Sequence, residues 1–394
     1  MTSKRSYYTT PLFILTTIIS LVVFVHHQRN QQRVVDIYEN MYLQSLQQNI
    51  SFTQKIQEYN NREEEVVRMT TPDSVRAIYI SSWVAGTPSL RSKLFDFIND
   101  SNINAVIIDI KDSTGVISFP MDLPLVKEYE TGSTRIRDIE NVIQELHDNN
   151  VYVIGRLTSF QDPLLSKKQP ELAFKRIDNN EIWTDRKGLA FINPKHEEAW
   201  DYLADIAEYS YNLGFDEINF DYIRYPSDGR ISNIDYDFAE GQNRASTMKL
   251  FYEYLDERLR SKGITISADV FGLATTAQDD IGIGQVFEDI YPHFDAIAPM
   301  VYPSHYGPGY FSYDNPNAHP YGVVQKSMQS AVDRANAMGE DPDKLRTWIQ
   351  DFSLGTPRYG VREVQDQIRA TYDIGLDSYM SWDPKNKYTK EAYK

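Results

Sequence analysis

Residues 197–224 read EEAWDYLADIAEYSYNLGFDEINFDYIR, an amphipathic helical pattern followed by a short strand pattern. Gly214 separates the two, at the position where glycine commonly ends a helix. The strand pattern over 217–224 is mostly apolar, as is typical of a parallel strand that is buried on both faces. The region therefore predicts one strand and helix of an α/β fold.

The same alternation recurs along the chain from Val75 onward. The other predicted strands are 77–83, 105–111, 151–157, 265–271, 296–302, 345–352 and 378–382, and the other helical patterns are 90–98, 136–149, 245–262, 323–338 and 361–372. Eight strands alternating with helices predict a single (β/α)8 TIM barrel. A doubly wound open sheet is the alternative, but it usually brings a glycine-rich phosphate turn. Gly282-Ile283-Gly284 follows no predicted strand directly, so no nucleotide site is expected.

The N-terminus predicts a membrane segment. Lys4 and Arg5 precede an uncharged run from Tyr7 to Val25, which as a helix rising ~1.5 Å per residue would cross about one bilayer core. We expect residues 1–27 to be a signal anchor, a single transmembrane helix in the cell membrane with the bulk of the chain exported. A cleaved signal, which would make the protein secreted, and a buried core helix are the alternatives.

Two further regions follow this segment. Residues 28–72 are rich in Gln, Asn and Glu, and they predict a polar, partly helical stalk, with a coiled-coil dimer segment as the alternative. Residues 73–394 are expected to form the barrel.

Composition excludes several classes of function. The chain has 394 residues, with Lys+Arg 40 against Asp+Glu 56 and a formal net charge of −16, which argues against a nucleic-acid partner because phosphate binding needs a basic field. It has no Cys, which excludes disulfides, thiolate zinc sites, iron–sulfur clusters and a cysteine nucleophile. The seven His form no His-x-His or His-Glu-x-x-His pattern. Neither a metal nor another cofactor is expected.

Carboxylates are frequent at the ends of the predicted strands, which is where a TIM barrel carries its active site. They are Asp109, Asp112, Asp221, Asp269, Asp351 and Asp383, with Lys111, Arg156 and Arg224 among them. A carboxylate in an apolar strand is costly unless it is paired or used. Any one of them could be a structural ion-pair partner, but their convergence on one rim favours a functional site.

The residue types favour chemistry on a sugar. Converging carboxylates without a histidine pair suit acid/base and nucleophilic work on a glycosidic bond. Aromatic residues end three predicted strands, and flat rings pack against the apolar C–H faces of sugars. The expected substrate-binding residues are Asp109, Lys111, Asp112, Arg156, Arg224, Trp83, Tyr302, His305 and Trp382.

Several linked motifs resemble a known family. They are FDYIRYP (220–226), SADVFG (267–272), PMVYPSHY (299–306), RTWIQDF (346–352) and SYMSWDPKNKYT (378–389). Over residues 75–390 the chain resembles the putative glycosyl hydrolase domain of bacterial envelope proteins. The resemblance implies a (β/α)8 barrel and a glycoside hydrolase activity.

Fold-level analogy with better-understood barrels suggests individual roles. In α-amylase-type enzymes the nucleophile, the acid and a third carboxylate end strands 4, 5 and 7, which here are the positions of Asp221, Asp269 and Asp351. Arg224 is then expected to orient or charge-balance Asp221. In chitinase-type enzymes strand 4 carries a catalytic Glu, but Ile223 occupies that position here, so a substrate-assisted chitinase mechanism is not expected.

The predicted function is a membrane-anchored or exported glycoside hydrolase acting on envelope or extracellular polysaccharide. A catalytically weak or silent polysaccharide-binding barrel of the envelope is the main alternative, because no Glu stands at the proposed acid position. Another barrel enzyme, such as a lyase or a deacetylase, is the third.

Overall fold

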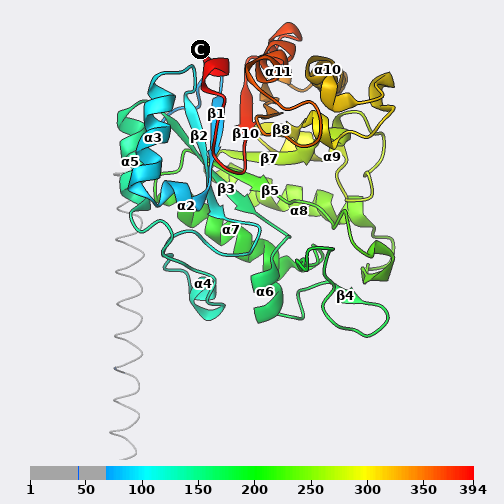
Figure 1. The fold of residues 1–394 in the computed structure, drawn as a ribbon. Coiled ribbons are helices and arrows are strands. Elements are labelled where there is room, and N and C mark those ends of the chain that lie inside the picture. The colour runs from blue at the N-terminus through cyan, green and yellow to red at the C-terminus, as the bar shows by residue number, and fades with distance from the viewer. Residues whose placement is uncertain (1–42, 44–67) are drawn as a thin grey trace, which may run out of the picture. The chain divides into compact units, whose positions relative to one another are not determined.

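Eight parallel strands close into a barrel in the part of the chain that the computed structural model describes, namely residue 43 and residues 68–394 (Figure 1). The strands are β1 Arg76–Ile80, β2 Ala105–Lys111, β3 Tyr152–Thr158, β5 Glu217–Asp221, β7 Ile266–Phe271, β8 Ala296–Met300, β9 Thr347–Gln350 and β10 Tyr379–Trp382. Each strand pairs with the next, and β10 pairs with β1. The predicted (β/α)8 barrel is therefore confirmed, and the open-sheet alternative is excluded by the closure.

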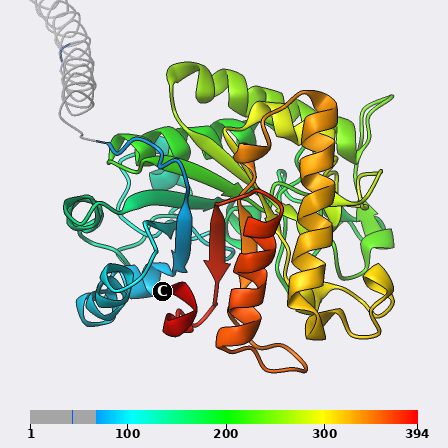
Figure 2. The same ribbon diagram turned by 90° about the horizontal axis from the view of Figure 1, so that it is seen from above.

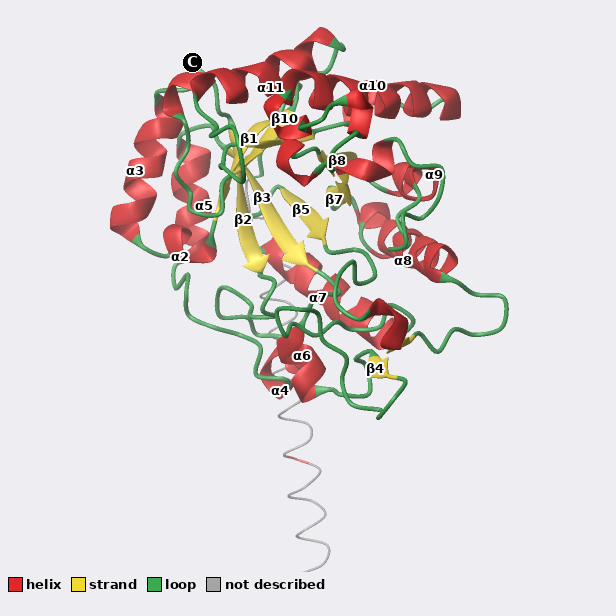
Figure 3. Cartoon of the chain, turned by 45° about the vertical axis from the view of Figure 1, so that its right-hand side comes forward, coloured by secondary structure: helices red, strands yellow, loops and turns green. Residues whose placement is uncertain are grey.

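Helices surround the strands (Figure 3). They are α2 Ser82–Ala85, α3 Pro88–Asn99, α4 Pro124–Glu128, α5 Ile139–Asp148, α6 Pro163–Lys168, α7 Glu197–Asn212, α8 Arg244–Arg258, α9 Phe287–Ile290, α10 Pro320–Met338 and α11 Val361–Asp373. The six predicted helices correspond to α3, α5, α7, α8, α10 and α11, and the last two lie side by side (Figure 2). The four short helices were not predicted, because one turn is too short to show a period.

The predicted membrane segment, residues 1–27, lies outside the described residues. So do residues 28–67 of the predicted stalk, apart from Leu43. Among the residues that the structure describes, no helix is long and apolar enough to span a bilayer.

Side chains alternate between two hydrophobic clusters along each strand. One cluster fills the inside of the barrel; it includes Tyr79, Ile107, Ile154, Trp348 and Met380. The other cluster lies between the strands and the helices. At the amino-terminal end of the barrel, buried Glu217 accepts hydrogen bonds of 2.7 and 2.8 Å from Arg346. Inward positions at the opposite end carry four of the predicted site residues, namely Asp109, Arg156, Asp221 and Asp269.

Four strands are shorter than predicted at their carboxyl ends. The first ends at Ile80, so that Trp83 lies in α2 rather than on a strand. The fourth ends at Asp221 instead of Arg224, because Tyr222 adopts a left-handed backbone conformation with φ of +53°. A left-handed residue interrupts the extended strand. The turn after Asp221 thus lies where the predicted site begins.

A short segment after β10 packs against the closed barrel. The 3₁₀ helix η9 Lys390–Tyr393 packs on α3, where the ring of Tyr393 meets that of Phe97 edge to face at 5.6 Å. The Tyr393 hydroxyl donates 2.8 Å to Asp351 Oδ2, and it lies 3.0 Å from Ser381 Oγ. This segment therefore links the end of the chain to three parts of the barrel.

Candidate active site

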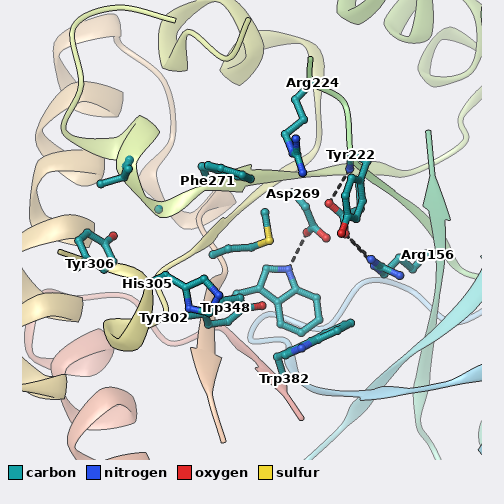
Figure 4. Close-up of a pocket in the computed structure, with 14 residues that line it drawn as sticks. Arg156, Tyr222, Arg224, Asp269, Phe271, Tyr302, His305, Tyr306, Trp348 and Trp382 are labelled. Carbon is teal, nitrogen blue, oxygen red and sulfur yellow. Dashed lines mark hydrogen bonds and ion pairs between the residues drawn. The ribbon is translucent and has the colours of Figure 1, made fainter. Parts of the chain in front are cut away.

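A cavity of about 350 Å³ opens at the carboxyl ends of the strands (Figure 4). It is lined by Arg156, Asp221, Tyr222, Arg224, Asp269, Phe271, Gly272, Leu273, Met300, Tyr302, His305, Tyr306, Trp348 and Trp382. Of the three predicted catalytic residues, Asp221 and Asp269 line this cavity and Asp351 does not.

Asp221 is held by a buried guanidinium. Arg156 donates to Asp221 Oδ2 from Nε, at 3.0 Å, and from Nη2. Its remaining nitrogen donates 2.7 Å to Asp109, which also accepts a hydrogen bond from the Tyr79 hydroxyl. Burial lowers the pKa of Arg156, but the two carboxylates outweigh that effect and raise the pKa well above its usual value. Arg156 therefore stays charged and is shared by Asp221 and Asp109.

The other oxygen of Asp221 is held by the backbone. Its Oδ1 accepts a 2.6 Å hydrogen bond from the amide of Tyr222, the residue with the left-handed conformation. A left-handed conformation is unfavourable for a tyrosine and is kept only where surrounding contacts enforce it. Here it directs the Tyr222 amide at the carboxylate and places the ring against the cavity.

Asp269 lies in a different environment. Its Oδ1 accepts hydrogen bonds from the Trp348 indole N–H at 2.7 Å and from the Asn219 amide at 3.0 Å. No hydrogen bond to Oδ2 is formed by any residue in the described range 68–394. Burial, followed by the nearby charge of Asp221, raises the pKa of Asp269 well above its usual value. Oδ2 is thus available to carry a proton and to meet a ligand.

The two aspartates occupy matching positions on neighbouring strands. β5 and β7 pair in parallel with Asn219 opposite Ser267 and Phe220 opposite Ala268, and Asp221 and Asp269 are the next residue in each strand. Neighbouring strands lie ~4.8 Å apart, so side chains on the same face at matching positions are close neighbours. This register explains why the charge of Asp221 affects Asp269.

Arg156, and not Arg224 as predicted, orients Asp221 through hydrogen bonds, and Arg224 interacts with Asp221 only through the attraction of their charges at longer range. The Arg224 guanidinium lies over the rings of Tyr222 and Phe271, 4.8 Å from each centroid, and its Nη1 donates 2.9 Å to the carbonyl of Tyr225.

Aromatic rings form much of the cavity wall. Trp382 stacks on Tyr79 with 4.1 Å between ring centroids and meets Trp348 edge to face. Tyr302 contacts His305 edge to face, and burial lowers the pKa of that histidine, which favours its neutral form. The predicted ligand-binding residues Tyr302, His305 and Trp382 thus lie together at the cavity.

A second, larger cavity of about 730 Å³ adjoins the first and shares Trp382 and His305 with it. It is lined by Asp351, Asp383, Arg358, Lys385 and Lys387, among others. Asp351 accepts hydrogen bonds from the Thr389 amide and hydroxyl and from the Tyr393 hydroxyl, and burial raises its pKa to about 6.

Four other predicted residues lie outside both cavities. Lys111 is fully buried, and its Nζ lies 2.8 Å from Asp162. Asp112 pairs with Arg135, whose guanidinium also lies over the ring of Trp83. Trp83 is 63% exposed. Asp109 reaches the site only through Arg156.

The sequence analysis missed two residues that position Asp269, namely Asn219 and Trp348. Each lies two residues before the end of its strand, on the face that points into the barrel. The alternation of side chains along a strand could have identified both residues from the sequence. In residues 68–394 no three His, Asp or Glu side chains gather as metal ligands.

Comparison with known proteins agrees with the architecture. Residues 77–388 match the model of a family described as a putative glycosyl hydrolase domain. A hypothetical protein from Ruminiclostridium thermocellum is 36% identical over 49% of this chain and 97% of its own, with a TM-score of 0.45. No match was found among curated proteins.

Two more distant structures share the fold. The PgaB glycoside hydrolase domain from Bordetella bronchiseptica is 12% identical, covering 82% of this chain and 99% of its own, with a TM-score of 0.57. The C-terminal domain of a putative chitinase from Desulfitobacterium hafniense is also 12% identical, covering 81% and 97%, with a TM-score of 0.51. Both similarities concern the barrel and not the chemistry of the site.

Proposed function

The chain belongs to the family of the putative glycosyl hydrolase domain, and we propose that it hydrolyses a glycosidic bond in envelope or extracellular polysaccharide, with Asp221 and Asp269 as its two catalytic carboxyl groups. One observation carries the proposal. Two carboxyl groups at matching positions on neighbouring strands face one cavity, one held by Arg156 and the other buried with its pKa raised well above its usual value. Glycosidases need such a pair.

Asp269 acts as the general acid. Burial and the charge of Asp221 keep it protonated, and the two N–H donors on Oδ1 leave the proton to Oδ2. In the reaction that proton passes to the glycosidic oxygen as the bond to the leaving group breaks.

Asp221 acts on the anomeric carbon. The Arg156 guanidinium and the Tyr222 amide donate hydrogen bonds to its two oxygens and fix its orientation. Its close register with Asp269 supports direct attack, which forms a glycosyl-enzyme ester, over activation of a distant water. Water then hydrolyses that ester, with Asp269 as the base, and the anomeric configuration is retained.

The aromatic walls bind the sugar. Tyr302 offers a flat surface in the first cavity and Trp382 offers one to both cavities, where consecutive sugar rings of a polysaccharide would lie. Asp351 would then contact a sugar in the second cavity and position the chain, instead of stabilising the transition state.

The decisive experiment measures the release of reducing sugar from a panel of envelope polysaccharides by the wild type and by Asp221→Asn. Release by the wild type that the variant abolishes supports the proposal. Polysaccharide binding without any release would favour the alternative of a binding barrel, and release of acetate or of an unsaturated sugar would indicate a deacetylase or a lyase.

For the N-terminal region we propose that residues 1–27 anchor the protein in the cell membrane, with residues 28–72 as a stalk and the barrel exported. The uncharged run from Tyr7 to Val25 supports this reading. The full chain should then stay in the membrane pellet after alkaline carbonate extraction and keep its N-terminus. A soluble product that begins after residue 25 would instead indicate a cleaved signal.

A further inference from the structure

Arg224 is the exception among the buried arginines of residues 68–394. Arg91, Arg156 and Arg346 each pair with a carboxylate. Arg224 is only 8% exposed and forms no ion pair with any described residue. Within the described residues its one hydrogen bond runs from Nη1 to the carbonyl of Tyr225, so that most of its N–H groups have no acceptor there.

The guanidinium is positioned toward the cavity. The rings of Tyr222 and Phe271 each lie 4.8 Å from it and hold its plane, and Figure 4 shows it entering the same space as Asp269. A buried cation costs free energy unless it is paired, and burial lowers the pKa of Arg224 accordingly. The fold therefore keeps a positive charge at the cavity without providing its partner.

The neighbouring acids are already engaged or do not contact it. Asp221 is hydrogen-bonded to Arg156 and attracts Arg224 only from beyond ion-pair distance, and burial raises the pKa of Asp269. Asp185 and Asp228 affect Arg224 only at longer range, because neither lies within ion-pair distance. An anion entering the cavity would find one available guanidinium.

We propose that Arg224 binds an anionic substituent of the sugar, a carboxylate or an ester phosphate, and that the substrate is therefore an acidic polysaccharide. This inference rests on the proposed function and narrows its substrate class. A guanidinium can donate two parallel hydrogen bonds to either group, whereas a neutral sugar hydroxyl leaves its charge unbalanced.

The second cavity continues the same pattern. Arg358, Lys385 and Lys387 line it, against the two acids Asp351 and Asp383. The whole chain carries a net charge of −16, so its overall field would repel an acidic polymer. Recognition therefore comes from contacts inside the cleft and not from long-range attraction.

The test compares binding by the full chain of matched oligosaccharides. One arm uses oligoglucuronate and its carboxyl-reduced neutral counterpart; the other uses a phosphate-substituted oligoglucose and the same unsubstituted neutral oligomer. Affinities are measured by calorimetry for wild type, Arg224→Gln, Arg224→Lys and, as a surface control, Arg230→Gln, which changes a side chain that is 71% exposed.

We expect wild type and Arg230→Gln to bind one acidic ligand at least tenfold more tightly than its neutral partner. The arm that shows this preference identifies carboxylate or phosphate. Arg224→Gln should lose the preference while still binding the neutral oligomer, which also shows that it is folded, and Arg224→Lys should retain part of the preference. An acidic preference that survives in Arg224→Gln, or is absent from the wild type in both arms, would overturn the proposal.

The calorimetric measurement of affinity does not require hydrolysis. The proposed anion site and the proposed hydrolase activity can therefore be rejected independently of each other. A preference that depends on Arg224 in a protein that releases no reducing sugar would support the anion site and reject the hydrolase. Hydrolysis of neutral polymers with no acidic preference would support the hydrolase and reject the anion site.

Discussion

Trp348 donates a 2.7 Å hydrogen bond from its indole N–H to Oδ1 of Asp269. This bond favours the ionised carboxylate and lowers the pKa of Asp269, opposing the effect of burial. In Trp348→Phe the pKa should therefore rise, and the basic limb of the pH–rate profile should move to higher pH. Trp382→Phe, which also changes a cavity indole but forms no hydrogen bond with Asp269, should leave the limb in place. A basic limb that moves equally in both variants would contradict this role.

Asp269→Asn tests the acid directly. The amide cannot donate the proton, so kcat should fall by two or more orders of magnitude on substrates with poor leaving groups, and the basic limb should disappear. Aryl glycosides with very good leaving groups need less protonation and should keep much more activity. An equal loss on both kinds of substrate would mean that Asp269 is not the acid.

The register of Asp221 and Asp269 predicts the stereochemistry. Neighbouring carboxyl groups ~5–5.5 Å apart are typical of retaining glycosidases, and a wider gap is typical of inverting ones. The first product detected by NMR, before mutarotation, should have the same anomeric configuration as the substrate. The opposite anomer would assign Asp221 as a base that activates water.

Arg156 should be essential for the folded barrel as well as for activity. Arg156→Met would leave Asp109 and Asp221 buried without their shared cation. Removing one partner of a buried ion pair typically costs ~3–5 kcal/mol of unfolding free energy. Urea denaturation would measure the loss. The triple variant Arg156→Met, Asp109→Asn and Asp221→Asn should recover part of the lost unfolding free energy. If it recovers none, the loss comes from the packing of the Arg156 side chain and not from its charge.

Asp351 predicts a pH dependence of stability. Its pKa is raised from the usual Asp range to about 6, chiefly by burial, so the folded state favours the protonated form. That contribution is complete below about pH 4 and is lost as the pH rises through about 6. A shift of about two units corresponds to about 3 kcal/mol.

Asp351→Asn lacks this titration. From pH 4 to pH 7 its unfolding free energy should therefore improve relative to wild type by up to about 3 kcal/mol. Urea melts of both proteins at the two pH values would show it. A difference between the proteins that does not change with pH would contradict the buried, titrating carboxyl.

The strands and the six long helices could be predicted because both produce local patterns in the sequence. Buried strands read as short apolar runs, and helices of three or more turns show their period. The early end of the fourth strand could not be predicted in this way. It depends on the left-handed conformation of Tyr222, which the contacts of its ring and amide in the folded barrel maintain.

For the candidate site, the sequence predicted which residues lie near the strand ends, but not which of them form ion pairs with one another. Arg156 lies near the end of β3 and Arg224 follows β5, but only the closed barrel shows that Arg156 is the one that pairs with Asp221. Parity also matters at the strand ends. The strand register shifts between Asp109 and Lys111, and the lysine side chain pairs with Asp162 instead of entering the site. Asp351 stands three residues after the inward-facing Trp348, so the alternation of side chains along the strand does not direct it inward.

The pairing of β1 with β10 constrains how the protein can fold during synthesis. Val75 donates its amide hydrogen to the side chain of Ser378, a contact across 303 positions of sequence. The Tyr393 hydroxyl also donates a hydrogen bond to Asp351. While residues after 378 are still being translated, β1 and β9 remain two unpaired edges that can recruit strands from other chains. Such long-range closure is intrinsically slow. The nascent barrel is therefore expected to depend on chaperones until Tyr393 has left the ribosome.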